Sequence, residues 1–593
     1  MNKNSIISWD LSALYSSFDS KEFQNDLNSI KSMILGFDKS LNDNIKTGQS
    51  PEKIIKLYLD FATNINNLLI KIYSFAELTV TTDTNNTEAL KYVNIIDDYS
   101  SEKVKPIVKF QKYLSSVKNL DEILNHNDYF KIHEFHIKEL ASNSQYLLTD
   151  EEEILYAKLK QTGSTAFTTL QNKVSSNLMI EIELNGESQK LPLSSIRNLA
   201  YDKDTEVRKK AYIAEIDSYK NIEEVSAMAL NSIKGEVITM SKKRGYKSPL
   251  DMSLKEARVD EKTLNTMLKA MEESIPEFVK YFRKKGELLG DNNGLKFYNL
   301  FAPIGNSNME FTYDEAKDFI LQQFYGFSKR LGDFAQKAFD NNWIDPFPKE
   351  GKLGGAFCAN LHTIKESRIL SNFEGSFNDM DTLAHELGHG YHGEVLTEVS
   401  VINSDYPMPL AETASIFCET IVFNAALKDA KKDDKIAILE SSIMQSAQVI
   451  IDIYSRFLFE SEFFKKREEG ALSVEEIKKL MLDAQKKAYR DGLDSEFLHP
   501  YMWACKPHYY DVDYNFYNYP YAFGLLFAKG LYAQYEQNKE DFLIKYDELL
   551  KRTGNNSVYD AVKFVGIDLH DIEFWRASLR IVTSEIDEFL KLV

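Results

Sequence analysis

The sequence has few of the residues that break or cross-link a chain. Its 593 residues include 25 glycines, 13 prolines and three cysteines. Average usage is about 7% glycine and about 5% proline, so breakers of regular structure are scarce. This composition favours long helices, excludes a collagen-like chain and disfavours a β-sandwich.

The cysteines are too few and too scattered for a framework of disulfides. They lie at Cys358, Cys418 and Cys505, an odd number with no CxxC spacing. This pattern excludes a CxxC metal or redox site. We therefore expect buried free thiols in the reducing environment of the cytoplasm.

Positive charge and long apolar runs are scarce as well. The chain carries 71 lysines and arginines against 90 acidic residues, a formal net charge of −19. That charge repels phosphate backbones and anionic lipid, which argues against nucleic acid or a membrane surface as a partner. No run approaches the ~18 apolar residues of a membrane span, and the amino terminus lacks a signal-peptide pattern. We expect a soluble cytoplasmic protein.

Helical periodicity dominates the first third of the chain. Apolar residues recur at steps of three and four between residues 51 and 75, and Pro51 stands where a helix start tolerates proline. Thr149 and Glu152 have the spacing of a capping box. Three apolar residues follow it: Ile154, Leu155 and Leu159. The first 175 residues are therefore predicted to form packed helices.

Extended structure is indicated at three places. At 179–193 apolar residues alternate with acids ahead of Asn185-Gly186, a hairpin signal. Residues 295–305 form a second patch after a long helical stretch. Residues 354–364 and 367–373, separated by a Lys-Glu turn, form a third. Because the third patch directly precedes the motif described next, we predict a mainly α protein with a small β-sheet beside that motif.

The stretch at 381–396 contains His385-Glu386-x-x-His389 and no helix breaker except glycine. On a helix, residues i and i+4 share a face, so both imidazoles are able to bind one ion. Glu386 lies about 100° round the helix from His385, near the metal without blocking it. That position suits a general base for water activated by the metal. The motif predicts one catalytic Zn²⁺ ion per chain.

The third ligand distinguishes between types of HExxH site. A metzincin requires glycine at 392 and histidine at 395, but this chain has His392 and Val395. An acid from a following helix is the other common solution. Glu412 is expected in the first turn of a helix over 409–423, as the third ligand or as an acid favoured by the helix dipole. Glu419, seven residues later on the same face, is expected to orient a ligand histidine or to serve another partner.

Two more residues near the motif have alternative interpretations. His392 shares the face of His385, and we expect it to pack or to support a ligand rather than to bind the metal. Asp381, one turn before His385, either orients that imidazole or caps the helix.

A second group of candidate residues lies at 507–524. Residues 509–521 hold six tyrosines, whereas the 32 tyrosines of the whole chain predict fewer than one in such a stretch. His508 stands at the head of this run. Aromatic runs are usually core, but phenol hydroxyls and imidazoles also stabilise an oxyanion. The residues alone leave both interpretations open.

Seven segments, in order along the chain, resemble oligoendopeptidase F of the thimet oligopeptidase and neurolysin superfamily of zinc metallopeptidases. TLAHELGHGYH followed by AETAS is much more specific than the zinc motif, which many peptidases share. The segments are WDLSALY (9–15), LLTDEEEILYAKLKQTGSTAF (147–167), RGYKSPLDMSL (244–254), GGAF (354–357), TLAHELGHGYH (382–392), AETASIFCE (411–419) and PHYYDVDYNFYNYPYAFG (507–524).

The resemblance implies a mainly helical, two-lobed protein with a deep central channel and zinc at the channel floor. Residues 1–190 then form part of the channel wall, and residues 191–593 form the catalytic domain. The implied substrates are short unstructured oligopeptides, because the channel walls exclude folded proteins. His385, His389 and Glu412 match the zinc ligands of the family. Glu386 matches its general base.

The resemblance also assigns residues that bind the substrate. Gly354 and Gly355 fall where the family pairs an edge strand with the peptide backbone, and glycine there allows close approach. His508, Tyr517 and Tyr519 match the histidine and tyrosines that line the site. The mammalian relatives have a glycine-rich loop after that histidine, whereas this chain has DVDYNF.

Two other functions compete with an endopeptidase. A carboxypeptidase of similar helical architecture would leave an end-blocked peptide uncut. A catalytically silent peptide-binding protein would have no need of Glu386 beside the metal. We therefore expect a zinc oligoendopeptidase in which Glu386 accepts a proton from water and returns it to the leaving amine.

Overall fold

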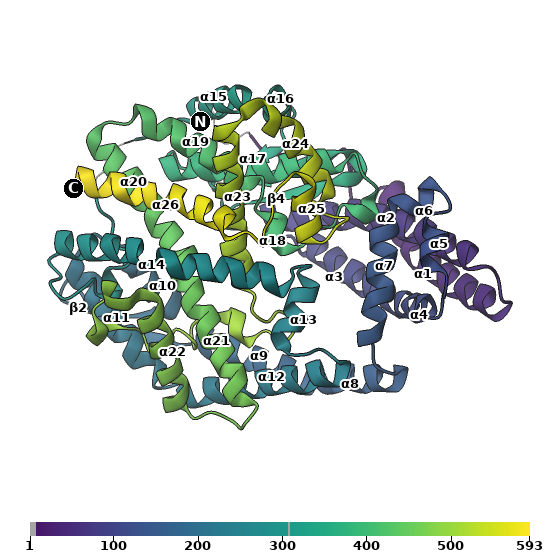
Figure 1. Cartoon of the computed structure of the whole chain (residues 1–593), viewed down its shortest axis with the longest axis horizontal. Coiled ribbons are helices and arrows are strands. Elements are labelled where there is room, and N and C mark those ends of the chain that lie inside the picture. The colour runs from purple at the N-terminus through teal and green to yellow at the C-terminus, as the bar shows by residue number, and fades with distance from the viewer. Residues whose placement is uncertain (1–6, 306–308) are drawn as a thin grey trace. The chain divides into compact units, whose positions relative to one another are not determined.

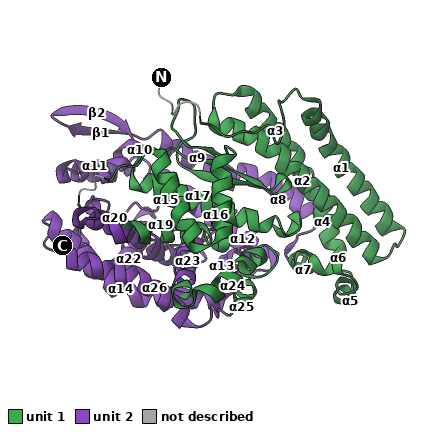
Figure 2. Cartoon of the chain, turned by 90° about the horizontal axis from the view of Figure 1, so that it is seen from above, with its two compact units in different colours: residues 1–145, 309–426, 534–566 green, residues 146–308, 427–533, 567–593 purple. Residues whose placement is uncertain are grey.

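The computed structural model describes residues 7–305 and 309–593. The chain is 71% helical and its sheets are small, which confirms the predicted mainly α fold class. Two compact units each combine three segments of the chain (Figure 2). Unit 1 comprises residues 1–145, 309–426 and 534–566, and unit 2 comprises residues 146–308, 427–533 and 567–593. The functional division at residue 190 and the channel stay predictions.

Unit 1 contains the amino-terminal helices, the helix of the HExxH motif and a three-stranded sheet (Figure 1). Its helices are α1 (Lys21–Lys46), α2 (Pro51–Thr82), α3 (Thr87–Ser101), α4 (Val104–Leu114), α5 (Leu120–Leu124), α6 (Asp128–Ile132), α7 (Glu134–Asn143), α15 (Tyr313–Phe327), α16 (Lys329–Asp340), α17 (Phe377–Leu396), α18 (Met408–Ala411), α19 (Ser415–Asp429), which ends just beyond it, α24 (Lys539–Arg552) and α25 (Val558–Phe564).

The helix predicted from residue 51 is α2. Ser50 caps it by accepting a hydrogen bond from the Lys53 N–H, and Pro51 occupies the first turn, where no amide hydrogen is needed. The buried face of α2 joins a core that also contains Leu361 and Leu370 of the small sheet. The amino-terminal helices therefore share a core with the sheet beside the motif.

That sheet has the strand order β3–β5–β4, with β3 over Ile344–Asp345, β4 over Phe357–Leu361 and β5 over Glu366–Leu370. β4 and β5 are antiparallel and joined through Lys365, whose φ of +55° makes the turn. Among the described strands β4 pairs with β5 alone, so its other side is a sheet edge. Both strands pack against α17, which confirms the predicted sheet beside the motif.

Unit 2 is built around long helices and one hairpin (Figure 1). Its elements are α8 (Asp150–Thr162), α9 (Ser164–Ser176), β1 (Met179–Leu184), β2 (Glu187–Pro192), α10 (Leu193–Asn198), α11 (Thr205–Tyr219), α12 (Glu223–Arg244), α13 (Pro249–Glu256), α14 (Glu261–Leu289), α20 (Lys432–Ala447), the π-helix η7 (Gln448–Asp452), α21 (Ile453–Arg467), α22 (Val474–Tyr489), α23 (Tyr519–Gln537), which ends just beyond it, and α26 (Ile572–Leu592).

Two local predictions in unit 2 are confirmed. β1 and β2 form an antiparallel hairpin, and both turn residues, Asn185 and Gly186, have positive φ, as a tight hairpin turn requires. Thr149 and Glu152 form the capping box of α8. The three apolar residues that follow the box are nevertheless more than half exposed: Ile154, Leu155 and Leu159. The cap, rather than burial of these side chains, accounts for the start of this helix.

The predicted extended patch at 295–305 is wrong except for a single bridge at Leu295. A turn of 3-10 helix, η4 (Phe297–Asn299), replaces it. The side chain of Asn299 accepts hydrogen bonds from Arg208 and donates one to Asp291. These contacts with distant residues favour the turn over a strand.

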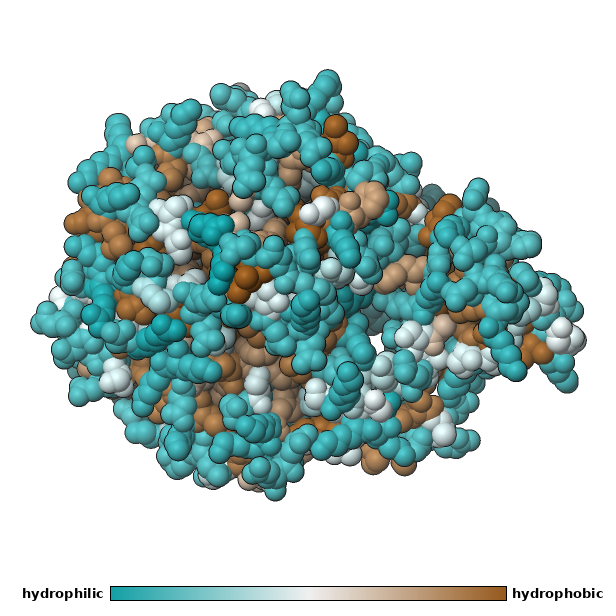
Figure 3. All heavy atoms as spheres, in the orientation of Figure 1, coloured by the Kyte–Doolittle hydropathy of each residue, from teal (hydrophilic) through white to brown (hydrophobic). Residues whose placement is uncertain are grey.

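Two stretches have the length and apolar composition of a membrane span, Met408–Asp429 and Lys432–Arg467. In each apolar window 56% is buried in the protein, as in a core helix. The first stretch also contains the turn with Glu412 between α18 and α19. Hydrophilic residues cover most of the face shown in Figure 3, and hydrophobic residues there form separate small patches.

Candidate metal centre and active site

The motif helix α17 begins at a capping box. Ser376 accepts a hydrogen bond from the Asp379 N–H, and the Asp379 carboxylate accepts one from the Ser376 N–H. Asp381 therefore does not cap the helix, and that alternative is wrong. Its other predicted role, orienting His385, stays a prediction.

Gly388 sets how closely the next segment approaches α17. A Cβ built there would lie 2.5 Å from the carbonyl oxygen of Ala414 and 2.6 Å from the Cα of Ser415. Contacts this short are forbidden, so only glycine lets the chain that carries Glu412 lie against the motif helix. In the sequence this residue is only a glycine tolerated within a helix, and its packing role becomes visible in the structure alone.

Glu412 lies in the turn between α18 and α19, not in the first turn of a helix as predicted. Its carbonyl accepts the Ile416 N–H (3.2 Å), and the Ser415 hydroxyl donates to its Oε2 (2.7 Å). The bond from Ser415 is a local side-chain bond of the kind that favours turns over helix interiors, whereas the Ile416 bond has the i→i+4 spacing of a helix. Glu412 and Glu419 therefore do not share one helical face.

The structure brings together one donor atom each from His385, His389 and Glu412, all within 4.8 Å of one another. Oε2 of Glu412 is 3.2 Å from His385 Nε2 and 3.4 Å from His389 Nε2. Donor atoms ~2.0–2.1 Å from a tetrahedral zinc ion lie about 3.3–3.4 Å from each other. Two imidazoles and one carboxylate at this spacing fit zinc.

The side chain of Glu419 contacts the ring nitrogen of His385 that does not face Glu412. His385 Nδ1 donates to Oε2 of Glu419 (3.1 Å), which leaves its Nε2 free to face Glu412. Burial lowers the pKa of His385, but the carboxylates of Glu412 and Glu419 outweigh burial and raise that pKa well above its usual value. The surroundings of His385 therefore favour positive charge, which a bound cation supplies.

We expect Glu419→Ala to weaken zinc binding by roughly 10–100-fold, because the partner that orients His385 is lost. Competition with a chromogenic chelator measures this affinity. Glu419→Gln is the matched control, since its amide oxygen still accepts from Nδ1, and its affinity should lie between those of the wild type and Glu419→Ala. An unchanged affinity in Glu419→Ala would show that Glu419 serves another partner.

Glu386 lies beside these donors without joining them. The residue is 6% exposed, and its Oε2 has no hydrogen-bond partner within 7–305 and 309–593. Burial raises the pKa of its carboxyl. A buried carboxylate oxygen without a partner is unusual and is the atom expected to contact a water molecule or substrate.

His392 packs, as one of its interpretations predicted. It is fully buried, its Nε2 lies 2.9 Å from the Thr553 hydroxyl, and its ring stacks on Tyr406 at 4.2 Å. Burial lowers its pKa to about 3, so the ring is neutral.

In unit 2 the tyrosine run is part core and part accessible. Tyr509, Tyr510 and Tyr519 are each 1% exposed. The ring of Tyr517 is half-buried and stacks on His508 at 5.3 Å. Tyr521, one of the six tyrosines of the run but not among those that the resemblance assigns, packs on the edge of Tyr517 at 5.7 Å. Tyr514 is 60% exposed, and its ring packs on Tyr517 at 5.7 Å. The accessible side chains of the run are therefore His508, Tyr514, Tyr517 and Tyr521, whereas the role of Tyr519 stays a prediction.

Gly354 and Gly355 are exposed in the loop that leads into the edge strand β4. A Cβ at Gly354 would meet nothing within 4 Å, and Gly355 has a φ of +82°. Of these two glycines, only Gly355 has a backbone conformation that favours glycine. Close approach of a substrate to either residue stays a prediction.

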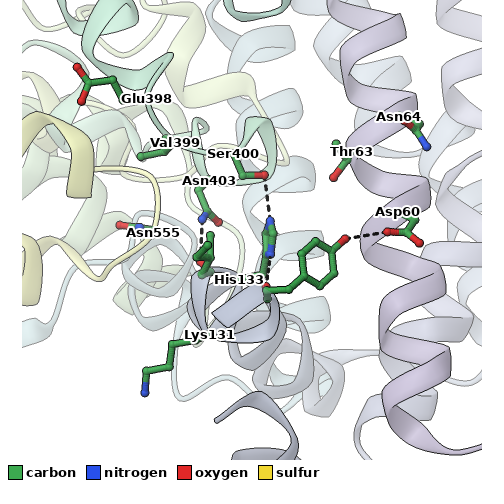
Figure 4. Close-up of a pocket in the computed structure, with 12 residues that line it drawn as sticks. Asp60, Thr63, Asn64, Lys131, His133, Glu398, Val399, Ser400, Asn403 and Asn555 are labelled. Atoms are coloured by element: carbon green, nitrogen blue, oxygen red, sulfur yellow. Dashed lines mark hydrogen bonds between the residues drawn. The ribbon is translucent and has the colours of Figure 1, made fainter. Parts of the chain in front are cut away.

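Unit 1 also has a hollow of about 790 Å³, lined mostly by polar residues that do not include the three predicted zinc ligands (Figure 4). Its acidic groups already have partners: Asp60 binds Lys56 and the Tyr129 hydroxyl. Both ring nitrogens of its His133 are hydrogen-bonded, to the Tyr129 carbonyl and the Ser400 hydroxyl. We assign no chemistry to this pocket.

Comparisons with known proteins show which family the chain is similar to. A family model described as peptidase family M3 matches residues 198–581, and one described as oligopeptidase F matches residues 116–179. An oligoendopeptidase F homolog from Lactococcus lactis is 24% identical over 612 residues, covering 100% of this chain and 98% of the relative. Oligopeptidase PepF from Bacillus subtilis is 22% identical over 600 residues, covering 99% and 87%.

Solved structures show the same fold. One from Chlamydophila abortus has a TM-score of 0.86 at 22% identity and covers 99% of this chain and 98% of its own. An oligoendopeptidase-F from Enterococcus faecium has a TM-score of 0.71 at 17% identity and covers 96% and 99%. The first family model spans more than half of the sequence. The resemblance is therefore confirmed, and the chain belongs to peptidase family M3.

Proposed function

We propose that this chain is a zinc endopeptidase that hydrolyses internal bonds of short unstructured oligopeptides. The observation that carries the proposal is the approach of His385, His389 and Glu412 to zinc-ligand spacing. Beside them lies the buried carboxylate of Glu386, whose Oε2 has no hydrogen-bond partner in the described part of the chain. His385, His389 and Glu412 would hold one Zn²⁺ ion per chain. Zinc there supplies Lewis acidity, which polarises a carbonyl and lowers the pKa of water.

The residues of the chain then act in a defined order. Glu386 takes a proton from the attacking water, whose oxygen forms a bond to the carbonyl carbon of the peptide. As the C–N bond breaks, Glu386 gives that proton to the leaving amine. Glu419 keeps His385 in the orientation that presents its Nε2.

Residues outside the metal centre bind the substrate and stabilise the oxyanion. His508 and Tyr517 or Tyr519 donate hydrogen bonds to the oxyanion, and Tyr517 is the more accessible of the two phenols. The edge of β4, with Gly354 and Gly355 ahead of it, accepts the substrate as an added strand. Residues 1–190 form part of a channel wall that excludes folded proteins, and residues 191–593 form the catalytic domain. The enzyme acts in the cytoplasm.

We expect a mixed pool of short peptides to be cut internally, including peptides blocked at both ends. A chelator should abolish cleavage, added zinc should restore it, and a folded globular protein should survive. Mass spectrometry of the digests measures all of these outcomes. Cleavage confined to free carboxyl ends would identify a carboxypeptidase, and binding without cleavage would identify a peptide-binding protein.

A further inference from the structure

The loop 511–518 leads from His508 to α23 and has an unusual backbone. Phe516 in this loop has a φ of +54°, a left-handed conformation that a bulky side chain adopts only where its surroundings impose it. Its ring is buried between Phe457 (5.6 Å) and Phe464 (5.4 Å) of α21. Ring contacts with α21 therefore hold the residue that directly precedes Tyr517.

A buried ion pair holds the loop on one side of Phe516. Lys234 of α12 donates to Glu460 of α21 (2.8 Å), and the side chains of both are at most 3% exposed. The same ammonium donates to Oδ1 of Asn515 (2.8 Å). The amide nitrogen of Asn515 in turn donates to the Val512 carbonyl (3.0 Å), which closes the loop on itself.

A second buried ion pair holds the loop on the other side. Arg456 donates to Asp452 at the end of the π-helix η7, and Arg456 also donates to Oδ1 of Asn518 (3.0 Å). Asn518 is 3% exposed and precedes α23. Because Asn515 and Asn518 flank Phe516 and Tyr517, the two pairs fix the backbone of Tyr517 from both directions.

Stability alone gives no reason to place two ion pairs here. Replacing a buried pair by apolar side chains of similar volume is often neutral or stabilising. In each pair the cation also donates a hydrogen bond to an asparagine of the same loop. These asparagines lie close to Phe516, the only described residue within 507–524 whose φ is positive. The geometry therefore favours a role in choosing one loop conformation.

We propose that Lys234 and Arg456 are positioning residues, which act through Asn515 and Asn518 to hold Tyr517 against His508. This inference rests on the proposed function, in which His508 and Tyr517 stabilise the oxyanion. A misplacement of about 1 Å in such a group costs roughly 100-fold in rate.

Asn518→Leu and Asn515→Leu test the proposal, because each cuts one link while the ion pair behind it stays paired. We expect hydrogen exchange in peptides covering 507–524 to become at least tenfold faster. We expect kcat to fall roughly 10–100-fold with little change in KM, because the oxyanion donors act in the transition state. Asn518→Asp keeps an acceptor for Arg456 and should restore both readouts towards wild type.

Asn299→Leu is the matched control. Asn299 is also buried in unit 2 and accepts hydrogen bonds from a buried arginine, Arg208, but has no bond to the loop 511–518. This variant should lower the melting temperature and leave kcat and the exchange of 507–524 unchanged.

Unchanged exchange in 507–524 of both link variants would overturn the proposal. Faster exchange with normal kcat would also overturn it, since the loop would then be anchored without serving the reaction. Neither outcome contradicts the proposed zinc endopeptidase activity. Failure of that proposed function would appear instead as a wild-type protein that cuts no peptide.

Discussion

Glu386→Gln is expected to bind zinc with near wild-type affinity and to cleave peptides roughly 10²–10⁴-fold more slowly. Glu386 is 6% exposed, and glutamine has the same shape, so the packing round the side chain is preserved. Glutamine removes the negative charge that accepts a proton from water. Because Glu386 is not among the three donors that converge, metal content should not change.

Zinc content by mass spectrometry and kcat on an end-blocked peptide measure this result. Glu394→Gln is the matched control: it lies two helical turns further along α17 and outside the group of donors. That variant should keep both zinc and turnover. A Glu386→Gln enzyme that is metal-replete and fully active would refute the role of Glu386 as the base.

The second large effect is expected for Glu412→Ala, which should lose zinc and activity together. Three donors become two, and a pair of imidazoles on one helix binds zinc far more weakly than the complete set. Burial raises the pKa of Glu412, but the bonds with His385 and His389 outweigh burial and hold it well below its usual range. The carboxylate is therefore charged over the whole working pH range.

Metal analysis after dialysis and thermal melts with and without a chelator check this prediction. A chelator should lower the melting temperature of the wild type, because zinc binds the folded state, and should not change that of Glu412→Ala. Glu412→Gln keeps the shape and the contact with Ser415 while removing the charge. If Glu412→Ala retains one zinc per chain, another acid is the ligand, and Glu419 is the next candidate.

Several features of the fold were predictable because their causes lie within a few residues. Pro51 and the apolar period that follows it are sufficient for the start of α2, and Asn185-Gly186 is sufficient for the hairpin turn. The capping box of Thr149 and Glu152 is likewise a local device. In each case the interacting groups are neighbours along the chain, so the sequence displays them directly.

Predictions that depended on distant neighbours failed. Residues 295–305 have strand-like composition, but Asn299 is bound by Arg208, which lies 91 residues away. The apolar residues of α8 have a helical spacing, yet Ile154 is 59% exposed. Helical spacing predicts which face of a helix is apolar, but not whether another part of the chain covers that face. The prediction that places Glu412 in a helix fails for a local reason instead, because the hydroxyl of Ser415, three residues away, donates to its carboxylate in the turn.

The sequence by itself determined the chemistry of the site: two imidazoles on one face of a helix with a carboxylate beside them. Spacing along a helix is a local property, so HExxH was sufficient to predict it. Only the tertiary structure decided how Glu412 reaches the imidazoles across Gly388, and which nitrogen of His385 binds Glu419. Only the tertiary structure joined Lys234 to Asn515, which are 281 residues apart, because contacts over such separations leave no pattern in the sequence around either residue.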